Sequence, residues 1–137
     1  MIQRIMCVDI GEKRIGIAVS DMLGITAQGV ETFTRKGEGD ARYIADKAKE
    51  LDAALIVAGL PLNMNGSEGL AVEKVRAFMS EVEALGQKIA FQDERMTTIS
   101  AERTLIEADM SREKRRKVID KVAAVYILRG YLDTHNF

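Results

Sequence analysis

The sequence predicts an α/β protein built on a mixed five-stranded sheet with helices on both faces. Five short apolar runs have the length and composition of buried strands, and segments with helical periodicity separate the later runs. The first three runs follow one another too closely for a helix to intervene, so those strands should pair antiparallel. The helices between the later runs make those strands parallel. The predicted order of elements is β-β-β-α-β-α-β-α-α.

The first three predicted strands form the antiparallel part of the sheet. Residues 5–8 are continuously apolar, as in a strand covered on both faces, and they end at Asp9. A tight turn at 11–14 leads into a second strand at 15–19, and so short a connection requires a hairpin. The segment 30–34 is predicted to be a third and more exposed strand.

The rest of the chain alternates between helices and strands. Asp40 and Ser67 are of the residue types that cap helix N-termini, and each precedes an apolar stripe with helical spacing. The predicted segments are a helix from Asp40 to Leu51, a strand at 54–58 that ends at Gly59, a helix at 67–85, a strand at 88–92, a helix from Thr97 or Thr98 to about residue 108, and a last helix that ends near Leu132.

Length and composition bound the classes of protein to which the chain can belong. Its 137 residues fit one domain, predicted to span 1–137, and 47% hydrophobic with 30% charged residues is typical of a globular protein. No apolar run approaches the ~20 residues of a membrane span, and the acid at position 9 comes too early for a signal peptide. The single cysteine, Cys7, cannot form an internal disulfide, which favours a reducing cytoplasm.

The same composition excludes several chemistries. One cysteine and one histidine, His135, cannot build a Cys/His zinc site, and a nucleophilic triad would depend on a histidine close to the C-terminus. Carboxylates are abundant, with 21 Asp and Glu residues. If the protein is an enzyme, acids or a metal held by acids should therefore carry the reaction.

Three acidic positions stand where a site could form. Asp9 ends the first strand, Asp93 and Glu94 end the fifth, and Asp120 lies among small apolar residues of the last helix. In α/β sheets, ligands bind beyond the carboxyl ends of the strands. Converging carboxylates without His or Cys suit Mg²⁺ or Mn²⁺, which could activate water and stabilise the leaving oxygen of a phosphodiester. The alternatives are structural: Asp9 would close the turn, and Asp93 and Glu94 would enter a helix.

Charge is nearly balanced over the whole chain, at −1, but it is concentrated locally. Six of the ten residues from Arg112 to Lys121 are basic. Such a stretch fits the phosphate backbone of a nucleic acid, although basic stretches are also common on solvated helix faces. The functional interpretation predicts that a nucleic-acid strand lies beside Asp120.

Four segments resemble the signatures of the YqgF family, whose bacterial members are Holliday-junction-resolvase-like proteins regarded as pre-16S ribosomal RNA nucleases. The segments are Asp9–Asp21, Gly59–Gly66, Asp93–Thr98 and Ile119–Ala124, in the family's order and across nearly the whole chain. The resemblance implies a ribonuclease H-like fold. It also implies metal-dependent phosphodiester hydrolysis that matures the 5′ end of 16S ribosomal RNA in ribosome biogenesis.

The resemblance further implies roles for individual residues. Asp9, Glu94 and Asp120 take the acidic positions that bind Mg²⁺ or Mn²⁺ and carry catalysis. In related resolvases a carboxylate ends the fourth strand, where this chain has Gly59, so Glu94 must substitute for it. Asp93 is the competing choice, because alternate residues of a strand face opposite ways. We choose Glu94.

The implied partner is nucleic acid, as pre-16S rRNA or structured RNA or DNA, together with ribosomal components and without a membrane. The residues predicted to contact it are Lys13, Arg14, Arg95, Arg112, Lys114, Arg115, Arg116 and Lys117. Two other functions remain open. One is the resolution of Holliday junctions in branched DNA, and the other is a non-catalytic RNA- or protein-binding module with the same fold.

Overall fold

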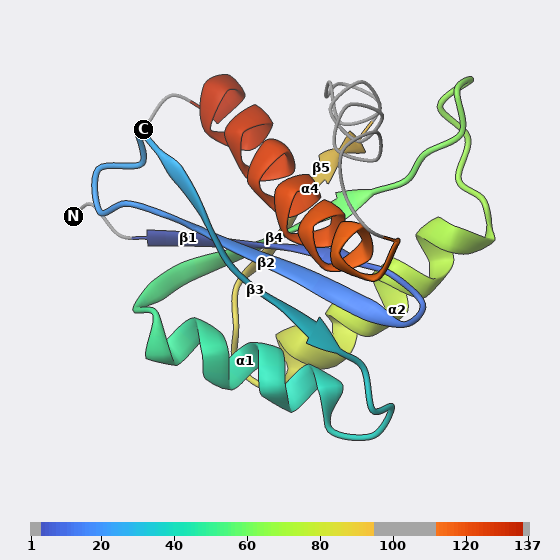
Figure 1. Ribbon diagram of the computed structural model, residues 1–137, viewed down its shortest axis with the longest axis horizontal. Coiled ribbons are helices and arrows are strands. Elements are labelled where there is room, and N and C mark those ends of the chain that lie inside the picture. The colour runs from blue at the N-terminus through green and yellow to red at the C-terminus, as the bar shows by residue number, and fades with distance from the viewer. Residues whose placement is uncertain (1–3, 95–111, 136–137) are drawn as a thin grey trace.

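The computed structural model describes residues 4–94 and 112–135, with the side chains of 4–94 and 121–134 (Figure 1). Its elements are β1 (Arg4–Ile10), β2 (Arg14–Ser20), β3 (Ala27–Thr34), α1 (Asp40–Glu50), β4 (Ala53–Leu60), α2 (Leu70–Ala84), β5 (Ile89–Asp93) and α4 (Arg112–His135). The predicted order is confirmed over these residues, and the helix predicted between about 97 and 108 lies outside them. None of these helices has the length and apolar character that a membrane crossing requires.

The five strands form one sheet in the order β3-β2-β1-β4-β5. β1 and β2 pair antiparallel, as do β2 and β3, whereas β4 is parallel to β1 and β5 is parallel to β4. The N–H of Gly11 closes the first hairpin by donating to the Arg14 carbonyl at 2.9 Å. A Cβ on Gly11 would stand 2.8 Å from that oxygen, so the turn needs glycine. The mixed sheet predicted from the spacing of the apolar runs is confirmed.

Helices cover both faces of the sheet (Figure 1). α1 and α2 pack on one face, and α4 lies across the other, over β1, β2 and β3. β1 contributes to both cores, since Met6 and Val8 face α1 and α2 while Ile5 and Cys7 face α4. This alternation decides which side chains can meet where the strands end.

The start of α1 differs from the prediction that Asp40 is its N-cap. Gly39 takes the N-cap position in the left-handed conformation, with φ 88°, and no side chain caps the helix. The Asp40 carboxylate instead accepts hydrogen bonds from the backbone N–H groups of Lys36 and Gly37, each at 3.0 Å. Asp40 therefore holds the loop that precedes the helix rather than the first turn of the helix itself.

The start of α2 also differs from the predicted cap. The helix begins at Leu70, three residues after Ser67, and its N-cap is Gly69. The Ser67 hydroxyl donates to Oδ1 of Asn65 at 2.6 Å, inside the loop between β4 and α2. The prediction that Ser67 caps the helix is wrong, because a serine hydroxyl can bond within the preceding loop as readily as to the first turn of a helix.

Candidate active site

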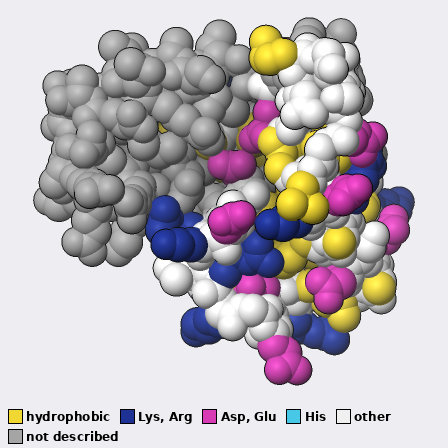
Figure 2. Space-filling model, turned by 90° about the vertical axis from the view of Figure 1, so that its right-hand side faces the viewer, with side chains coloured by type: hydrophobic (Ala, Val, Ile, Leu, Met, Phe, Trp, Pro, Cys, Tyr) yellow, Lys and Arg dark blue, Asp and Glu magenta, His cyan; other side chains and the backbone are white. Residues whose placement is uncertain are grey.

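The carboxyl ends of β1, β4 and β5 border a cavity of about 550 Å³. Its walls include Asp9, Gly11, Arg35, Gly59, Lys74 and Glu94. Figure 2 views the molecule from this edge and shows acidic and basic side chains close together on it. Two of the three acids predicted to form a site, Asp9 and Glu94, therefore line one cavity.

Asp9 and Glu94 both influence the pKa of the same buried thiol, that of Cys7. Cys7 precedes Asp9 by two residues in β1 and is fully buried under α4. Burial raises the pKa of the Cys7 thiol, and the negative charges of Asp9 and then Glu94 raise it further. The two carboxylates thus come close to one point of the sheet from different strands. The thiol stays protonated there, which makes it a poor nucleophile.

The alternation of β5 distinguishes Glu94 from Asp93. Phe91 packs against the core under α1 and α2, whereas Ala90 packs against the core under α4. Alternate residues of a strand share a face, so position 93 falls on the face of Phe91 and position 94 on the face of Ala90. Glu94 also lines the cavity. The structure therefore places Glu94 on the side of the sheet where Asp9 lies, which favours the choice of Glu94 over Asp93.

Gly59 at the end of β4 leaves the space that Glu94 occupies. A Cβ built on Gly59 would stand 2.9 Å from Cγ and 3.0 Å from Cδ of Glu94, and 2.7 Å from Cδ1 of Ile127 in α4. Two of these distances are shorter than real Cβ contacts, so any larger residue would displace Glu94 or Ile127. The Glu94 side chain thus lies against the end of β4, where the resemblance implies that related resolvases carry their own carboxylate.

The third predicted acid, Asp120, belongs to α4, and its side chain lies outside the described part of the chain. Ala123, Ala124 and Ile127, which share its helix face by periodicity, are fully buried against the sheet. α4 therefore packs directly on the sheet along the helix face to which Asp120 belongs by periodicity. Among the described side chains, no three His, Cys, Asp or Glu residues form a group that could hold a metal ion.

The two carboxylates that do come together fit a hard divalent cation. Asp9 and Glu94 offer only oxygen ligands, which Mg²⁺ and Mn²⁺ prefer. Because both line one cavity, two negative charges lie at the same edge of the sheet, and a cation would reduce their repulsion. A ligand set of three protein groups would also need Asp120.

The residues predicted to contact nucleic acid are only partly within the described range. Lys13 and Arg14 lie where β2 begins, at the same edge of the sheet as Asp9, and Lys13 is exposed. Arg95 lies outside the described residues. The backbone of Arg112, Lys114, Arg115, Arg116 and Lys117 forms the first turns of α4, and their side chains lie outside the description.

Lys121, the last cation of the basic stretch, has a packing role. Its side chain lies across Gly29 of β3, where a Cβ would stand 2.6 Å from Cγ and 2.8 Å from Cδ of the lysine. The aliphatic stem of Lys121 therefore helps to seat α4 on the sheet. This contact fixes the spacing between α4 and β3 at Lys121, the residue that follows Asp120 in the chain.

Two cations of the cavity wall, Arg35 and Lys74, are not singled out by the sequence. Lys74 is exposed on α2 and pairs with Glu12 at 3.4 Å. Arg35 follows β3, and its guanidinium is held by Asp40 and Gly11. Each is an isolated cation without a motif around it, so no local pattern indicates that it reaches the cavity.

Comparison with known proteins relates the whole chain to one family. A family model described as "RuvX: Holliday junction resolvase" matches residues 3–134. A protein of Clostridioides difficile strain 630 named "Putative pre-16S rRNA nuclease" is 53% identical over 132 residues, which cover 95% of this chain and 94% of that protein. A protein of Clostridium kluyveri with the same name is 50% identical over 135 residues, covering 95% of this chain and 96% of its own.

A solved structure supports the fold assignment. Thermus thermophilus RuvC, determined in complex with a Holliday junction substrate, superposes with a TM-score of 0.58 and covers 96% of this chain and 94% of its own. Its sequence identity to this chain is 10%, so the likeness concerns the fold alone. The ribonuclease H-like architecture implied by the four motifs is confirmed.

Proposed function

The chain belongs to the RuvX family, the YqgF family that its motifs resemble, and on this basis we propose that it is a metal-dependent nuclease that hydrolyses RNA phosphodiester bonds. Its role would be to mature the 5′ end of pre-16S rRNA in the cytoplasm, in contact with ribosomal components. The names of relatives about half identical to it support this substrate. The observation that carries the chemistry is the convergence of Asp9 and Glu94 on one cavity at the carboxyl edge of the sheet.

In this proposal Asp9, Glu94 and Asp120 hold Mg²⁺ or Mn²⁺. When bound, the cation would supply Lewis-acid stabilisation and lower the pKa of a water molecule. The Asp9 and Glu94 carboxylates would hold that cation at the end of β1, at the edge of the sheet where the strand is proposed to lie. Gly59 keeps the Glu94 carboxylate in reach by leaving its side chain room beside β4. The cavity volume of about 550 Å³ is within the range of sites that bind a molecule the size of a nucleotide.

A second candidate function is favoured by the description of the family model. That description is Holliday junction resolvase, which would make branched DNA the substrate. Both reactions are phosphodiester hydrolysis at the same carboxylates, so the residues described above do not separate them. The shape of the nucleic acid separates the two functions, since a four-way junction and a single RNA strand present different backbones to the carboxyl edge of the sheet.

The experiment that tests the function compares the two substrates directly. Purified protein is incubated with precursor 16S rRNA and with four-way DNA, each in Mn²⁺ and in chelator. We expect cleavage of the RNA near the 5′ end of the mature sequence, in Mn²⁺ only. Preferred cleavage of the junction would assign the protein to branched DNA. Binding of RNA without any cleavage would make it a non-catalytic module.

A prediction concerns the basic residues at the start of α4. Each phosphate that a cation neutralises on a single strand adds about −0.7 to the slope of log affinity against log salt. Replacing Lys114, Arg115, Arg116 and Lys117 together by Gln should therefore flatten this slope by up to about 3 units. RNA affinity at several salt concentrations measures the change. Binding should weaken alike for all RNA sequences, since phosphate contacts carry no sequence information. An unchanged slope would mean that the stretch is a solvated helix face.

A further inference from the structure

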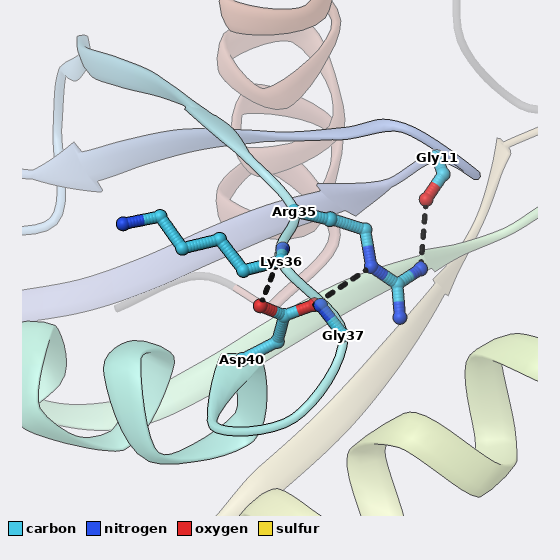
Figure 3. Close-up of polar contacts among 5 residues, drawn as sticks. All are labelled: Gly11, Arg35, Lys36, Gly37 and Asp40. Atoms are coloured by element: carbon cyan, nitrogen blue, oxygen red, sulfur yellow. Dashed lines mark hydrogen bonds and ion pairs between the residues drawn. The ribbon is translucent and has the colours of Figure 1, made fainter.

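Arg35 is the most firmly held cation described in the cavity wall. Its Nε donates to Oδ2 of Asp40 at 3.2 Å, and one terminal nitrogen, Nη1, donates to the carbonyl of Gly11 at 2.9 Å (Figure 3). The guanidinium carbon also lies 5.1 Å from the centre of the Phe78 ring in α2. Three separate parts of the fold thus fix one guanidinium: the turn after β1, the start of α1, and α2.

The partner of Arg35 is itself an anchored charge. Asp40 is only 2% exposed. Burial alone would raise the pKa of the Asp40 carboxyl, but the N–H groups of Lys36 and Gly37 and the Arg35 guanidinium together hold that pKa below its ordinary value. The carboxylate is therefore ionised at neutral pH, and its position does not depend on Arg35 alone. The fixed Asp40 carboxylate binds Nε of Arg35, and the Nη2 side of the guanidinium is left to the cavity.

The Arg35 guanidinium keeps N–H groups that donate no hydrogen bond to the described residues. A guanidinium has five N–H groups, and the two bonds above use one on Nε and one on Nη1. Within the part of the chain that the structure describes, Nη2 makes no hydrogen bond, and Figure 3 shows it pointing away from both partners. The side chain remains 27% exposed and lines the cavity that Asp9 and Glu94 also line.

We propose that Arg35 binds a backbone phosphate of the substrate strand and so positions the strand against Asp9 and Glu94. This inference rests on the proposed nuclease function. The cavity wall carries three acids, Asp9, Glu12 and Glu94, and would repel a polyanion without a compensating cation. Of the two cations described there, Lys74 is exposed and paired with Glu12, while Arg35 is pre-oriented. A guanidinium that is already fixed loses little conformational freedom when it binds phosphate.

Arg76 offers a matched control for Arg35. Arg76 also donates from Nε to a carboxylate, that of Glu68 at 2.7 Å, and its guanidinium carbon also lies 5.0 Å from an aromatic ring, that of Phe91. It does not line the cavity. Replacing either arginine by Gln removes one positive charge, one ion pair and one ring contact. Only Arg35→Gln removes a cation from the proposed path of the strand.

Asp40→Asn separates phosphate binding from a structural role. This change breaks the same ion pair but leaves the Arg35 charge in place. If Arg35 only fastens α1 to the turn after β1, the two variants should behave alike. If it binds phosphate, Arg35→Gln should weaken RNA binding more than Asp40→Asn does, because only Arg35→Gln removes the charge that meets the phosphate, whereas Asp40→Asn loosens a guanidinium that keeps its charge.

The test measures binding of a labelled single-stranded RNA in chelator, where cleavage does not occur, at several salt concentrations. All variants are first checked by thermal melting so that only folded protein is compared. We expect Arg35→Gln to bind about tenfold more weakly and to flatten the salt slope by about 0.7. Arg76→Gln and Asp40→Asn should keep the wild-type slope.

Equal binding by Arg35→Gln and Arg76→Gln would overturn the role of Arg35 and leave the nuclease proposal standing. Equal weakening by Arg35→Gln and Asp40→Asn would assign Arg35 a structural role and likewise overturn the inference. If the wild-type protein itself binds no RNA in chelator, the inference about Arg35 fails, while cleavage of precursor rRNA in Mn²⁺ still decides the nuclease proposal.

Discussion

Replacing Asp9 by Asn is expected to lower the rate of RNA cleavage by about a thousandfold while the protein stays folded. Lewis-acid stabilisation of the transition state by a bound metal is worth several kcal/mol, and about 4 kcal/mol corresponds to a factor of a thousand in rate. An asparagine keeps the size of the side chain but removes the charge that attracts the cation. Single-turnover cleavage of precursor rRNA in Mn²⁺ measures the effect. Glu94→Gln and Asp120→Asn should cause losses of similar size.

Asp93→Asn is the matched control for this prediction. It removes a carboxylate next to Glu94 in the chain, but position 93 follows the face of β5 that packs toward α1 and α2. We expect Asp93→Asn to cleave at nearly the wild-type rate. If Asp93→Asn were inactive and Glu94→Gln active, the assignment of the β5 ligand would be reversed.

Thermal melting with and without Mg²⁺ tests metal binding independently of cleavage. Mg²⁺ should raise the melting temperature of the wild-type protein, because a ligand that binds only the folded state stabilises it. Asp9→Asn and Asp120→Asn should respond less. If Asp120→Asn and wild type respond equally, Asp120 is not a ligand, and the site consists of Asp9 and Glu94 without it.

Gly59→Ala is expected to reduce cleavage by about a hundredfold and to destabilise the fold by about 1–3 kcal/mol. The new methyl group would stand 2.7 Å from Cδ1 of Ile127 and 2.9 Å from Cγ of Glu94. Ile127 is fully buried and has little room to move, so the conflict is relieved mainly by displacing Glu94. A displaced carboxylate no longer converges with Asp9. Urea unfolding and cleavage rates measure the two effects separately.

Two further variants make the Gly59 prediction specific. Gly69→Ala adds the same methyl group one residue before Leu70 of the cavity wall, but its Cβ would meet its nearest neighbour, Asn63, at an ordinary 3.5 Å, and φ is −104°. This variant should cleave at nearly the wild-type rate and lose at most about 1 kcal/mol of stability, because Gly69 is the N-cap of α2 and Ala is a poorer cap than Gly. In a Glu94→Ala background, the stability cost of Gly59→Ala should shrink, because one of the two clashing side chains is gone. An undiminished cost would show that Ile127 alone opposes the methyl group.

Sequence patterns were sufficient for the architecture and for the meeting of Asp9 and Glu94 at one edge of the sheet. The apolar run before Asp9 and the short connection after it predict the central hairpin, and the alternation of strands and helices predicts a mixed sheet. The carboxyl ends of parallel strands then place Asp9 and Glu94 at one edge, as the cavity shows. These inferences succeed because strand periodicity and hairpin length depend on residues that are close in sequence.

Helix starts were predicted less well, for a physical reason visible at Asp40. A carboxylate at the beginning of a helix can accept N–H groups from the first turn or from the preceding loop, and both lie within a few residues. The sequence around Asp40 allows either arrangement. Packing decides, because Arg35 approaches from the loop and Asp40 turns toward it, accepting the N–H groups of Lys36 and Gly37 as well.

By itself the sequence determined the order of the elements, the family, and the acids that end β1 and β5. Only the tertiary structure decided that Glu94 occupies the space beside Gly59 and that Arg35 enters the cavity wall. Both contacts join residues far apart in the chain, such as Arg35 and Gly11 at a separation of 24 residues. Such contacts follow from how the strands are ordered and which face each side chain takes, and these arise only when the whole sheet has packed between its helices.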